Sequence, residues 1–283
     1  MPIKHTDTKD VVILSYSAYS VYKQCPHKYY LEKILRMKVP EEDRSFTIPG
    51  LVVHEASERF LKEGDHSGFD ANSINAKLEE FNKEEQVDLI SAYGSIEKAQ
   101  NFSQICAENL NKFLMARNIP SKKFLTEAWF GTWEDPLFLS PNLATQGAPD
   151  LIEINENGSA ILYDFKSTWS TKYLNKDQLK LYCIASEIKF GVKITMASFF
   201  LLPANKHEYF RFSDADKNQL VDEMQVAANQ ILTLGEDLPC TPSERCDRCQ
   251  YFSTCTAGKE FTPPTKLETP KIEFGGTSFG ADL

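Results

Sequence analysis

Apolar and polar residues follow one another along this chain in patterns that separate strand-like from helix-like segments. Short runs rich in branched and aromatic residues predict strands, at residues 124–133, 151–154, 160–165, 194–202 and 207–212. Apolar residues that recur with helical spacing predict helices, at residues 54–63, 78–118, 177–190 and 213–232. This mixture predicts an α/β fold with a central mixed sheet flanked by helices and a helical insertion at about residues 55–120.

The second and third predicted strands are separated by an Asn-Gly pair, which favours a tight hairpin turn. Alternate residues of a strand share a face, so Asp164 and Lys166 project to the same side of the third strand. Asp150 stands at the start of the preceding strand, and the hairpin brings it beside them. The sequence therefore predicts two carboxylates and an ammonium group at the end of a small sheet.

That set of groups suits metal-assisted hydrolysis of a phosphodiester bond. Hard divalent cations such as Mg²⁺ prefer carboxylate oxygens and keep several waters, and they lower the pKa of an attacking water and stabilise the leaving oxygen. The plainer interpretation is that Asp164 and Lys166 form a solvated ion pair of little energetic weight. Asp150, which follows Pro149, has its own plainer interpretation as a turn residue.

Four other polar residues lie where they can join this group. Gln178 and Tyr182 are one helical turn apart and share a face, although a polar helix face needs no further role. His54 follows an apolar helix start, where a packed core histidine is the commoner interpretation. Glu127 lies in the first predicted strand and is interpreted as an edge charge or salt-bridge partner, with an extra metal ligand as the alternative. Trp129 and Trp133 share its face and are predicted to be core residues.

The cysteines form the strongest single pattern. Cys246 and Cys249 are a C-x₂-C pair, Cys255 follows after five residues, and Cys25 lies far upstream. A close cysteine triplet in a chain without a secretory signal indicates a metal site rather than disulfides. Four thiolates suit zinc or an iron–sulfur cluster, and the spacing does not separate these two. The remaining thiols, Cys106, Cys183 and Cys240, are predicted to be buried small apolar residues, although Cys240 is near enough to substitute for a ligand.

Taken in order, these motifs resemble the PD-(D/E)-x-K nuclease superfamily. Pro149-Asp150 followed by Asp164-Phe165-Lys166 matches its name-giving pattern. A G-x-x-x-H element and a Q-x-x-x-Y helix are features of its RecB-like members, and the C-x₂-C-x₅-C motif with one upstream cysteine resembles AddB-type nucleases and CRISPR-associated RecB-like exonucleases. The resemblance spans about residues 15–255.

The resemblance implies roles for these residues. The divalent-metal ligands would be His54, Asp150 and Asp164, with the carbonyl of Phe165 as a further ligand. Lys166 would orient water or stabilise the transition state, while Gln178 and Tyr182 would position DNA or support the metal ligands. The implied ligands of a [4Fe–4S] cluster, with zinc as the alternative, are Cys25, Cys246, Cys249 and Cys255.

Composition and charge set broad limits. The 283 residues carry a net charge of −9, which by itself disfavours nonspecific nucleic-acid binding. Residues 22–38 are locally basic and aromatic, which suits either a DNA-tracking segment or a solvated helix face. No stretch is long enough to span a membrane and no signal peptide is evident, so a cytoplasmic protein is expected. Residues 1–258 are predicted to be one nuclease domain and residues 259–283 a flexible tail.

The resemblance thus implies a Mg²⁺- or Mn²⁺-dependent deoxyribonuclease, an exonuclease acting on single-stranded DNA or DNA with free ends. Such a hydrolase would serve DNA repair, recombination or CRISPR-type DNA processing, with a protein partner from one of these systems. The alternative is a noncatalytic binding module for nucleic acid or protein, stapled by zinc or an iron–sulfur cluster. In that case the charged hairpin residues form an ordinary ion-pair cluster.

Overall fold

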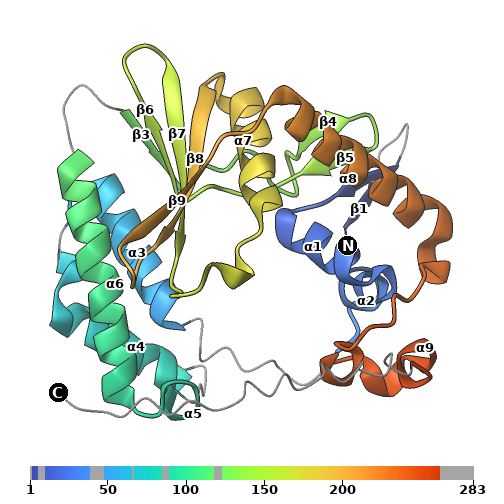
Figure 1. Ribbon diagram of the computed structural model, residues 1–283, viewed down its shortest axis with the longest axis horizontal. Coiled ribbons are helices and arrows are strands. Elements are labelled where there is room, and N and C mark those ends of the chain that lie inside the picture. The colour runs from blue at the N-terminus through green and yellow to red at the C-terminus, as the bar shows by residue number, and fades with distance from the viewer. Residues whose placement is uncertain are drawn as a thin grey trace, which may run out of the picture.

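The structure is a computed structural model that describes residues 2–5, 10–38, 48–65, 67–84, 89–117 and 123–261. Its strands form two mixed sheets with helices packed around them (Figure 1). The predicted α/β fold class, with a mixed sheet flanked by helices, is confirmed. The second, smaller sheet is an addition that the sequence pattern did not predict.

The larger sheet has the strand order β3-β6-β7-β8-β9. Its strands are β3 (Lys123–Thr126), β6 (Leu151–Ile154), β7 (Ser159–Lys166), β8 (Lys193–Leu201) and β9 (Lys206–Phe210). β7 and β8 run parallel, and the other neighbours run antiparallel. The predicted hairpin is confirmed: β6 pairs with β7, and Leu151 lies opposite Tyr163.

The two faces of the larger sheet pack against different helices. Tyr163 and Phe165 of β7 enter one core with α3 and α6, whereas Leu162 enters another with α7. Asp164 shares the face of Leu162 because successive strand residues alternate. Figure 1 shows α3 and α6 on one side of this sheet and α7 on the other. The helices are α3 (Ile48–Glu63), α6 (Ile96–Arg117) and α7 (Lys176–Phe190).

The smaller sheet has the order β1-β2-β5-β4. Its strands are β1 (Ile3–His5), β2 (Asp10–Ile13), β5 (Leu143–Thr145) and β4 (Leu137–Ser140). β2 and β5, from opposite halves of the chain, pair in parallel. The sequence pattern did not predict these strands, because strands of three or four residues are too short to show a clear alternation, and their pairing depends on contacts distant in sequence.

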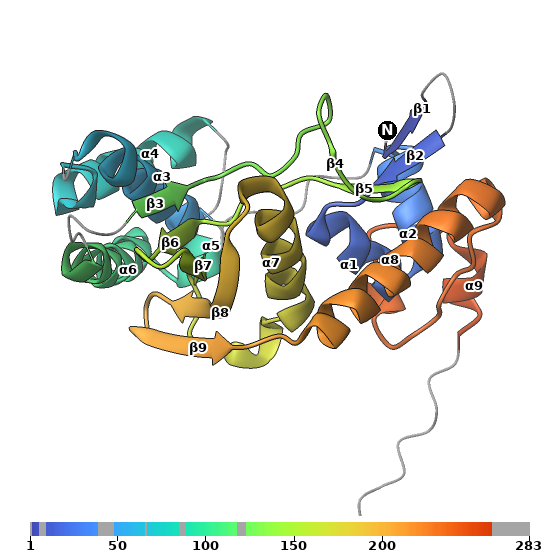
Figure 2. The same cartoon turned by 90° about the horizontal axis from the view of Figure 1, so that it is seen from above.

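The remaining helices complete two clusters. α4 (Ala71–Glu84) and α5 (Leu89–Tyr93) join α3 and α6, with a 3₁₀ turn at Ser67–Phe69. On the other side of the molecule, α7 packs with a group of helices seen from above in Figure 2. That group comprises α1 (Tyr16–Gln24), α2 (Pro26–Tyr29), the π-helical segment Tyr30–Ile34 and α8 (Asp214–Leu234). The other helical elements that the structure describes are short, at Thr171–Tyr173, Gly235–Asp237, Cys246–Arg248, Phe252–Thr254 and α9 (Thr256–Lys259).

Local sequence signals explain where several helices begin. Ser213 and Asp216 form a capping box at the start of α8. α3 begins at Ile48, earlier than predicted, and Pro49 suits its first turn, where no backbone N–H is needed. α4 begins at Ala71, directly after Asp70, because the Asp70 carboxylate accepts hydrogen bonds from backbone N–H groups of the first turn.

The first predicted strand is shorter than expected. β3 ends at Thr126, and Glu127 has a positive φ of 44°, which stops the extended conformation. Trp129 and Trp133 are 58% and 38% exposed, so their prediction as core residues is wrong. The turn at Glu127 removes both tryptophans from the alternation on which that prediction depended.

Two tyrosines of the basic, aromatic segment at residues 22–38 lie in the core. Tyr22 and Tyr29 are buried, so their rings belong to the core and are unavailable for stacking on bases. Most of the charged stretch at residues 41–49, whose composition indicates a loop, and most of the tail predicted at residues 259–283 lie outside the described residues. Among the helices that the structure describes, none has the length and apolar character needed to cross a membrane.

Candidate active site and cysteine pocket

The β6–β7 hairpin brings together the acidic residues that the sequence singled out. Asp150 immediately precedes β6, and its Oδ2 accepts a hydrogen bond from the backbone N–H of Phe165 on β7. Lys166 Nζ lies 2.6 Å from Asp164 Oδ2, as an ion pair rather than a well-directed hydrogen bond. Asp150 is thus tied to the strand that carries Asp164 and Lys166, as the hairpin predicted.

Helix α7 adds an amide and a phenol to this group. Gln178 Oε1 accepts a hydrogen bond from Lys166 Nζ at 3.0 Å, and Gln178 Nε2 donates to Asp164 Oδ1 at 2.9 Å. The same Nε2 also lies 3.3 Å from the Tyr182 hydroxyl. Asn175 caps α7 at its N-terminus and sets where this face begins. The predicted sharing of one helix face by Gln178 and Tyr182 is therefore confirmed.

A histidine and a second acid approach Asp150 from other elements. His54 of α3 has Nδ1 3.5 Å from Asp150 Oδ1. Glu127 follows β3, and its backbone N–H donates to the Asp150 carbonyl at 3.3 Å. His54, Glu127 and Asp150 each offer a ligand atom, and these atoms all lie within 4.8 Å of one another. Two carboxylates and an imidazole are suitable donors for a divalent cation such as Mn²⁺ or Mg²⁺.

Burial and mutual charge perturb these groups strongly. Burial raises the pKa of Glu127 to about 7, and the charge of Asp150 adds to the effect. Burial alone would lower the pKa of His54, but the charge and hydrogen bond of Asp150 outweigh it and raise that pKa to about 9. Burial also raises the pKa of Asp164, against the opposing charge of Lys166. A cation bound here would displace protons, as metal binding to titratable ligands does.

The predicted metal ligands are only partly brought into one group. His54 and Asp150 meet as expected, whereas Asp164 turns its oxygens toward Lys166 and Gln178. Phe165 places its ring in the core and its N–H on Asp150; a ligand role for its carbonyl stays a prediction. Glu127, treated as an edge charge or salt-bridge partner in the preferred interpretation, lies inside the group. The sequence signal for Glu127 was an acidic residue within an apolar stretch. The turn at Glu127 that directs its side chain toward Asp150 could not be predicted from the apolar pattern.

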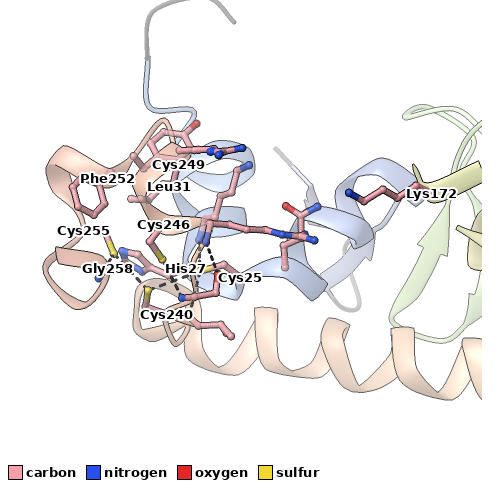
Figure 3. A pocket seen from close by; sticks show the side chains of 17 residues that line it. Cys25, His27, Leu31, Lys172, Cys240, Cys246, Cys249, Phe252, Cys255 and Gly258 are labelled. Atoms are coloured by element: carbon pink, nitrogen blue, oxygen red, sulfur yellow. Dashed lines mark hydrogen bonds between the residues drawn. The ribbon is translucent and has the colours of Figure 1, made fainter. Parts of the chain in front are cut away.

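A second cluster lies where the segment after α1 meets the segment after α8. Five cysteines line a cavity of about 720 Å³ (Figure 3), namely Cys25, Cys240, Cys246, Cys249 and Cys255. Cys25 follows α1, whereas the other four belong to the segment after α8. Within the described residues, no three of the sulfurs lie within 4.8 Å of one another, so the cavity is not a closed site for one ion. Cys106 and Cys183 are buried elsewhere, as predicted.

The position of Cys240 corrects the sequence-based assignment. It was predicted to be a buried apolar residue, yet its sulfur lies 4.0 Å from that of Cys25 and 3.5 Å from that of Cys255. The side chain is partly exposed rather than buried. Its nearness in sequence to the C-x₂-C-x₅-C motif already made Cys240 a candidate substitute ligand, whereas its contact with Cys25 depends on how the chain returns to the N-terminal segment.

Comparison with known proteins places the chain in a family. A solved structure titled "Crystal structure of SSO0001" is similar at 17% sequence identity, with 82% of this chain and 94% of that chain covered and a TM-score of 0.33. No curated protein matches the chain. Residues 13–256 match the family described as the PD-(D/E)XK nuclease superfamily, a span that includes His54, Asp150, Lys166 and Gln178. The chain therefore belongs to the PD-(D/E)XK nuclease superfamily, whose members act on nucleic acids with divalent metals.

Proposed function

We propose that this protein is a Mg²⁺- or Mn²⁺-dependent DNA exonuclease of the RecB-like type. The observation that carries the proposal is the joining of Asp150, Asp164, Lys166 and Gln178 by hydrogen bonds and an ion pair at one end of the hairpin. A solvated surface pair would not need a buried carboxylate, yet Asp164 is 3% exposed. A buried charged group is costly unless it is paired, so such a cluster is better explained by function than by stability.

His54, Asp150 and Asp164 are the proposed metal ligands, with Glu127 as an additional ligand and the Phe165 carbonyl completing the set. The approach of His54, Glu127 and Asp150 to one another supports this assignment. When bound, a divalent ion supplies Lewis-acid activation of water and charge stabilisation of the leaving oxygen. The protein's own contribution is to fix the carboxylates, which the Phe165 N–H does for Asp150.

Lys166 is the proposed group that orients the attacking water or stabilises negative charge on the phosphorus centre. Its ammonium is fixed on both sides, by Asp164 and by the Gln178 amide oxygen. Gln178 acts as a positioning residue, since its two polar atoms contact Asp164 and Lys166 separately. The Tyr182 hydroxyl accepts a hydrogen bond from the Gln178 amide, and the Tyr182 ring packs against Phe130 with ring centroids 5.7 Å apart. Tyr182 therefore helps to hold the amide in place.

The proposed substrate is DNA that is single-stranded or has free ends. Trp129 and Trp169 are 58% and 60% exposed, and they lie two residues after Glu127 and three residues after Lys166. Exposed aromatic rings are the groups on which unpaired bases stack. The net charge of −9 makes a broad electrostatic grip on duplex DNA less suitable than stacking beside the site.

The cysteine pocket is proposed to hold a [4Fe–4S] cluster, with zinc as the alternative occupant, through Cys25, Cys246, Cys249 and Cys255. Backbone N–H groups donate to three of these sulfurs: Lys28 and Thr241 to Cys25, Ser243 to Cys246, and Gly258 to Cys255. Hydrogen bonds to thiolate sulfurs are typical of such centres. A metal here would staple the ends of a single nuclease domain at residues 1–258, and metal binding would stabilise the fold.

The protein is proposed to work with a partner in DNA repair, recombination or CRISPR-type processing. The decisive experiment concerns cleavage itself. End-labelled linear DNA and circular DNA are incubated with Mg²⁺ or Mn²⁺ and either the unmodified protein, Lys166→Ala or Lys193→Ala. Lys193 is an exposed lysine at the start of β8 and is the matched control.

Metal-dependent loss of linear DNA by the unmodified protein and Lys193→Ala, but not by Lys166→Ala, is the expected result. Cutting of circular DNA would replace the exonuclease proposal with an endonuclease. Equal activity in Lys166→Ala would remove the proposed catalytic role of the lysine. No cleavage by folded, metal-loaded protein would favour a binding module instead.

A further inference from the structure

The pocket contains one more cysteine than a four-thiolate centre needs. Cys240 Sγ lies between the sulfurs of Cys25 and Cys255, at 4.0 and 3.5 Å. A tetrahedral ion with metal–sulfur bonds of about 2.3 Å holds its thiolates roughly 3.8 Å apart. For zinc as the occupant, the Cys240 sulfur therefore already stands at ligand-like separation from two of the proposed ligands. Figure 3 draws the contacts of Cys240 with Cys25 and Cys255 as dashed lines.

The backbone around Cys240 is fixed against the N-terminal segment. The Pro239 carbonyl accepts a hydrogen bond from the His27 N–H at 3.1 Å, and the Thr241 N–H donates to Cys25 Sγ at 3.4 Å. Leu238 is buried in the core shared with α1 and α8. Because its neighbours on both sides are anchored, Cys240 is held at Cys25 by the fold and does not belong to a freely moving loop.

Cys249 differs from the other proposed ligands. Its sulfur accepts no amide hydrogen bond from the described residues, whereas the sulfurs of Cys25, Cys246 and Cys255 each accept at least one. In Figure 3, Cys249 is labelled above the other four cysteines of the pocket. The C-x₂-C spacing nevertheless ties Cys249 to Cys246 by a single short turn, so it can approach the same centre.

We propose that Cys240 and Cys249 are interchangeable ligands for the fourth position of the metal centre, with Cys25, Cys246 and Cys255 as the constant three. The inference rests on the metal-binding pocket of the proposed function and adds the residue that the cysteine motif omits. The chemical consequence is tolerance: loss of one of the two thiols, by alkylation or oxidation, leaves the other to complete four-thiolate coordination.

The test uses the full chain with serine substitutions at the two positions. The unmodified protein, Cys240→Ser, Cys249→Ser and the double variant are reconstituted anaerobically with iron and sulfide or with Zn²⁺. Bound metal and thermal stability are then measured. Cys25→Ser is the positive control for ligand loss, and Cys106→Ala controls for substitution of a cysteine outside the pocket.

Each single variant is expected to keep the metal of the unmodified protein, and the double variant to lose it as Cys25→Ser does. Its affinity should fall at least about tenfold, since even outer contacts of a metal site are worth that much. Loss of metal by Cys249→Ser alone, as complete as in the double variant, would overturn the proposal. So would full metal retention by the double variant.

A measurement on the unmodified protein keeps the proposal testable where a variant fails to fold. The metal-loaded chain is alkylated under native conditions, and each cysteine is scored by mass spectrometry before and after chelation. Partial labelling shared between Cys240 and Cys249, with Cys25 and Cys255 protected until chelation, is expected. Complete labelling of Cys240 with full protection of Cys249 would contradict it.

Failure of this proposal and failure of the nuclease proposal are separate results. A chain that binds metal at the cysteines through Cys249 alone can still cleave DNA through Lys166. A chain that binds neither iron nor zinc would overturn both this inference and the metal staple, while the cleavage assay would still report on the acidic site. Metal content and alkylation therefore test the pocket independently of activity.

Discussion

Lys166 donates a hydrogen bond to the side-chain oxygen of Gln178 at 3.0 Å. This contact fixes which way the carboxamide faces, because the oxygen is committed to the ammonium and the NH₂ group must point to Asp164, 2.9 Å away. A strand residue and a helix residue thus hold one another in a single orientation. The position of the Lys166 ammonium therefore depends on Gln178, which is not one of the proposed metal ligands.

Replacing Gln178 with alanine should slow cleavage without weakening DNA binding. The loss of a hydrogen bond to a charged group is worth about 1.5–3 kcal/mol, which corresponds to a decrease of roughly ten- to a hundredfold in kcat. KM for DNA should change little if Gln178 only positions Lys166. Steady-state kinetics on a labelled oligonucleotide checks this, with Gln219→Ala, an exposed glutamine on α8, as the control. A change confined to KM would instead show that Gln178 contacts the substrate.

Replacing Glu127 with glutamine should weaken divalent-metal binding. The substitution keeps the size of the side chain and removes one charged oxygen from the group with His54 and Asp150. We expect the Kd for Mn²⁺ to rise about tenfold or more, since metal affinity is sensitive even to outer contacts. Isothermal titration calorimetry measures it, and Asp135→Asn, an exposed acid paired with Lys189, is the matched control. An unchanged Kd for Mn²⁺ would show that Glu127 is an edge charge and not a metal ligand.

Replacing Trp169 with alanine should weaken binding to single-stranded DNA more than binding to duplex DNA. Stacking of one base on an aromatic ring is worth about 1–3 kcal/mol, and this ring is 60% exposed. Trp169→Phe should recover part of the loss. Fluorescence anisotropy in the Lys166→Ala background measures binding without cleavage, and Phe138→Ala tests an exposed ring on the smaller sheet. Equal weakening for both forms of DNA would argue against stacking.

A methyl group at Gly50 should strain the contact between α3 and the loop after β7. A Cβ there would lie 2.3 Å from Ser167 Oγ and 3.0 Å from Ser167 Cβ. Gly50→Ala should therefore lower the free energy of unfolding by about 1–3 kcal/mol, as overpacking does. Urea denaturation of both single variants and of Gly50→Ala/Ser167→Gly forms a double-mutant cycle. The double variant should be more stable than additivity allows, and simple additivity would exclude the clash.

His207 should make the fold less stable in mild acid. Burial lowers its pKa to about 4, with the charge of Arg117 adding to the effect, whereas an unfolded chain has a histidine pKa of about 6.5. Between these values the unfolded state binds more protons, so the free energy of unfolding falls as the pH drops through that window. His207→Phe, which keeps the stacking on Phe200, should flatten this part of the pH profile. An unchanged profile in urea denaturation would contradict the assignment.

The sequence by itself determined the elements whose signals are local. The β6–β7 hairpin follows from two apolar runs and an Asn-Gly turn, and α7 and α8 follow from helical spacing. The meeting of Asp150 with Asp164 and Lys166 was predictable for the same reason. A period of two or of 3.6 residues, together with a short turn, is enough to specify which side chains share a face.

Only the tertiary structure decided which groups join from a distance. Glu127 reaches the group because the chain turns at a positive φ directly after β3, and the same turn exposes Trp129. Cys240 reaches Cys25 because Pro239 and Thr241 bind the N-terminal segment. The parallel pairing of β2 with β5 has the same origin. Such contacts depend on how whole elements pack and on where long loops close, and neither leaves a periodic trace in the neighbouring sequence.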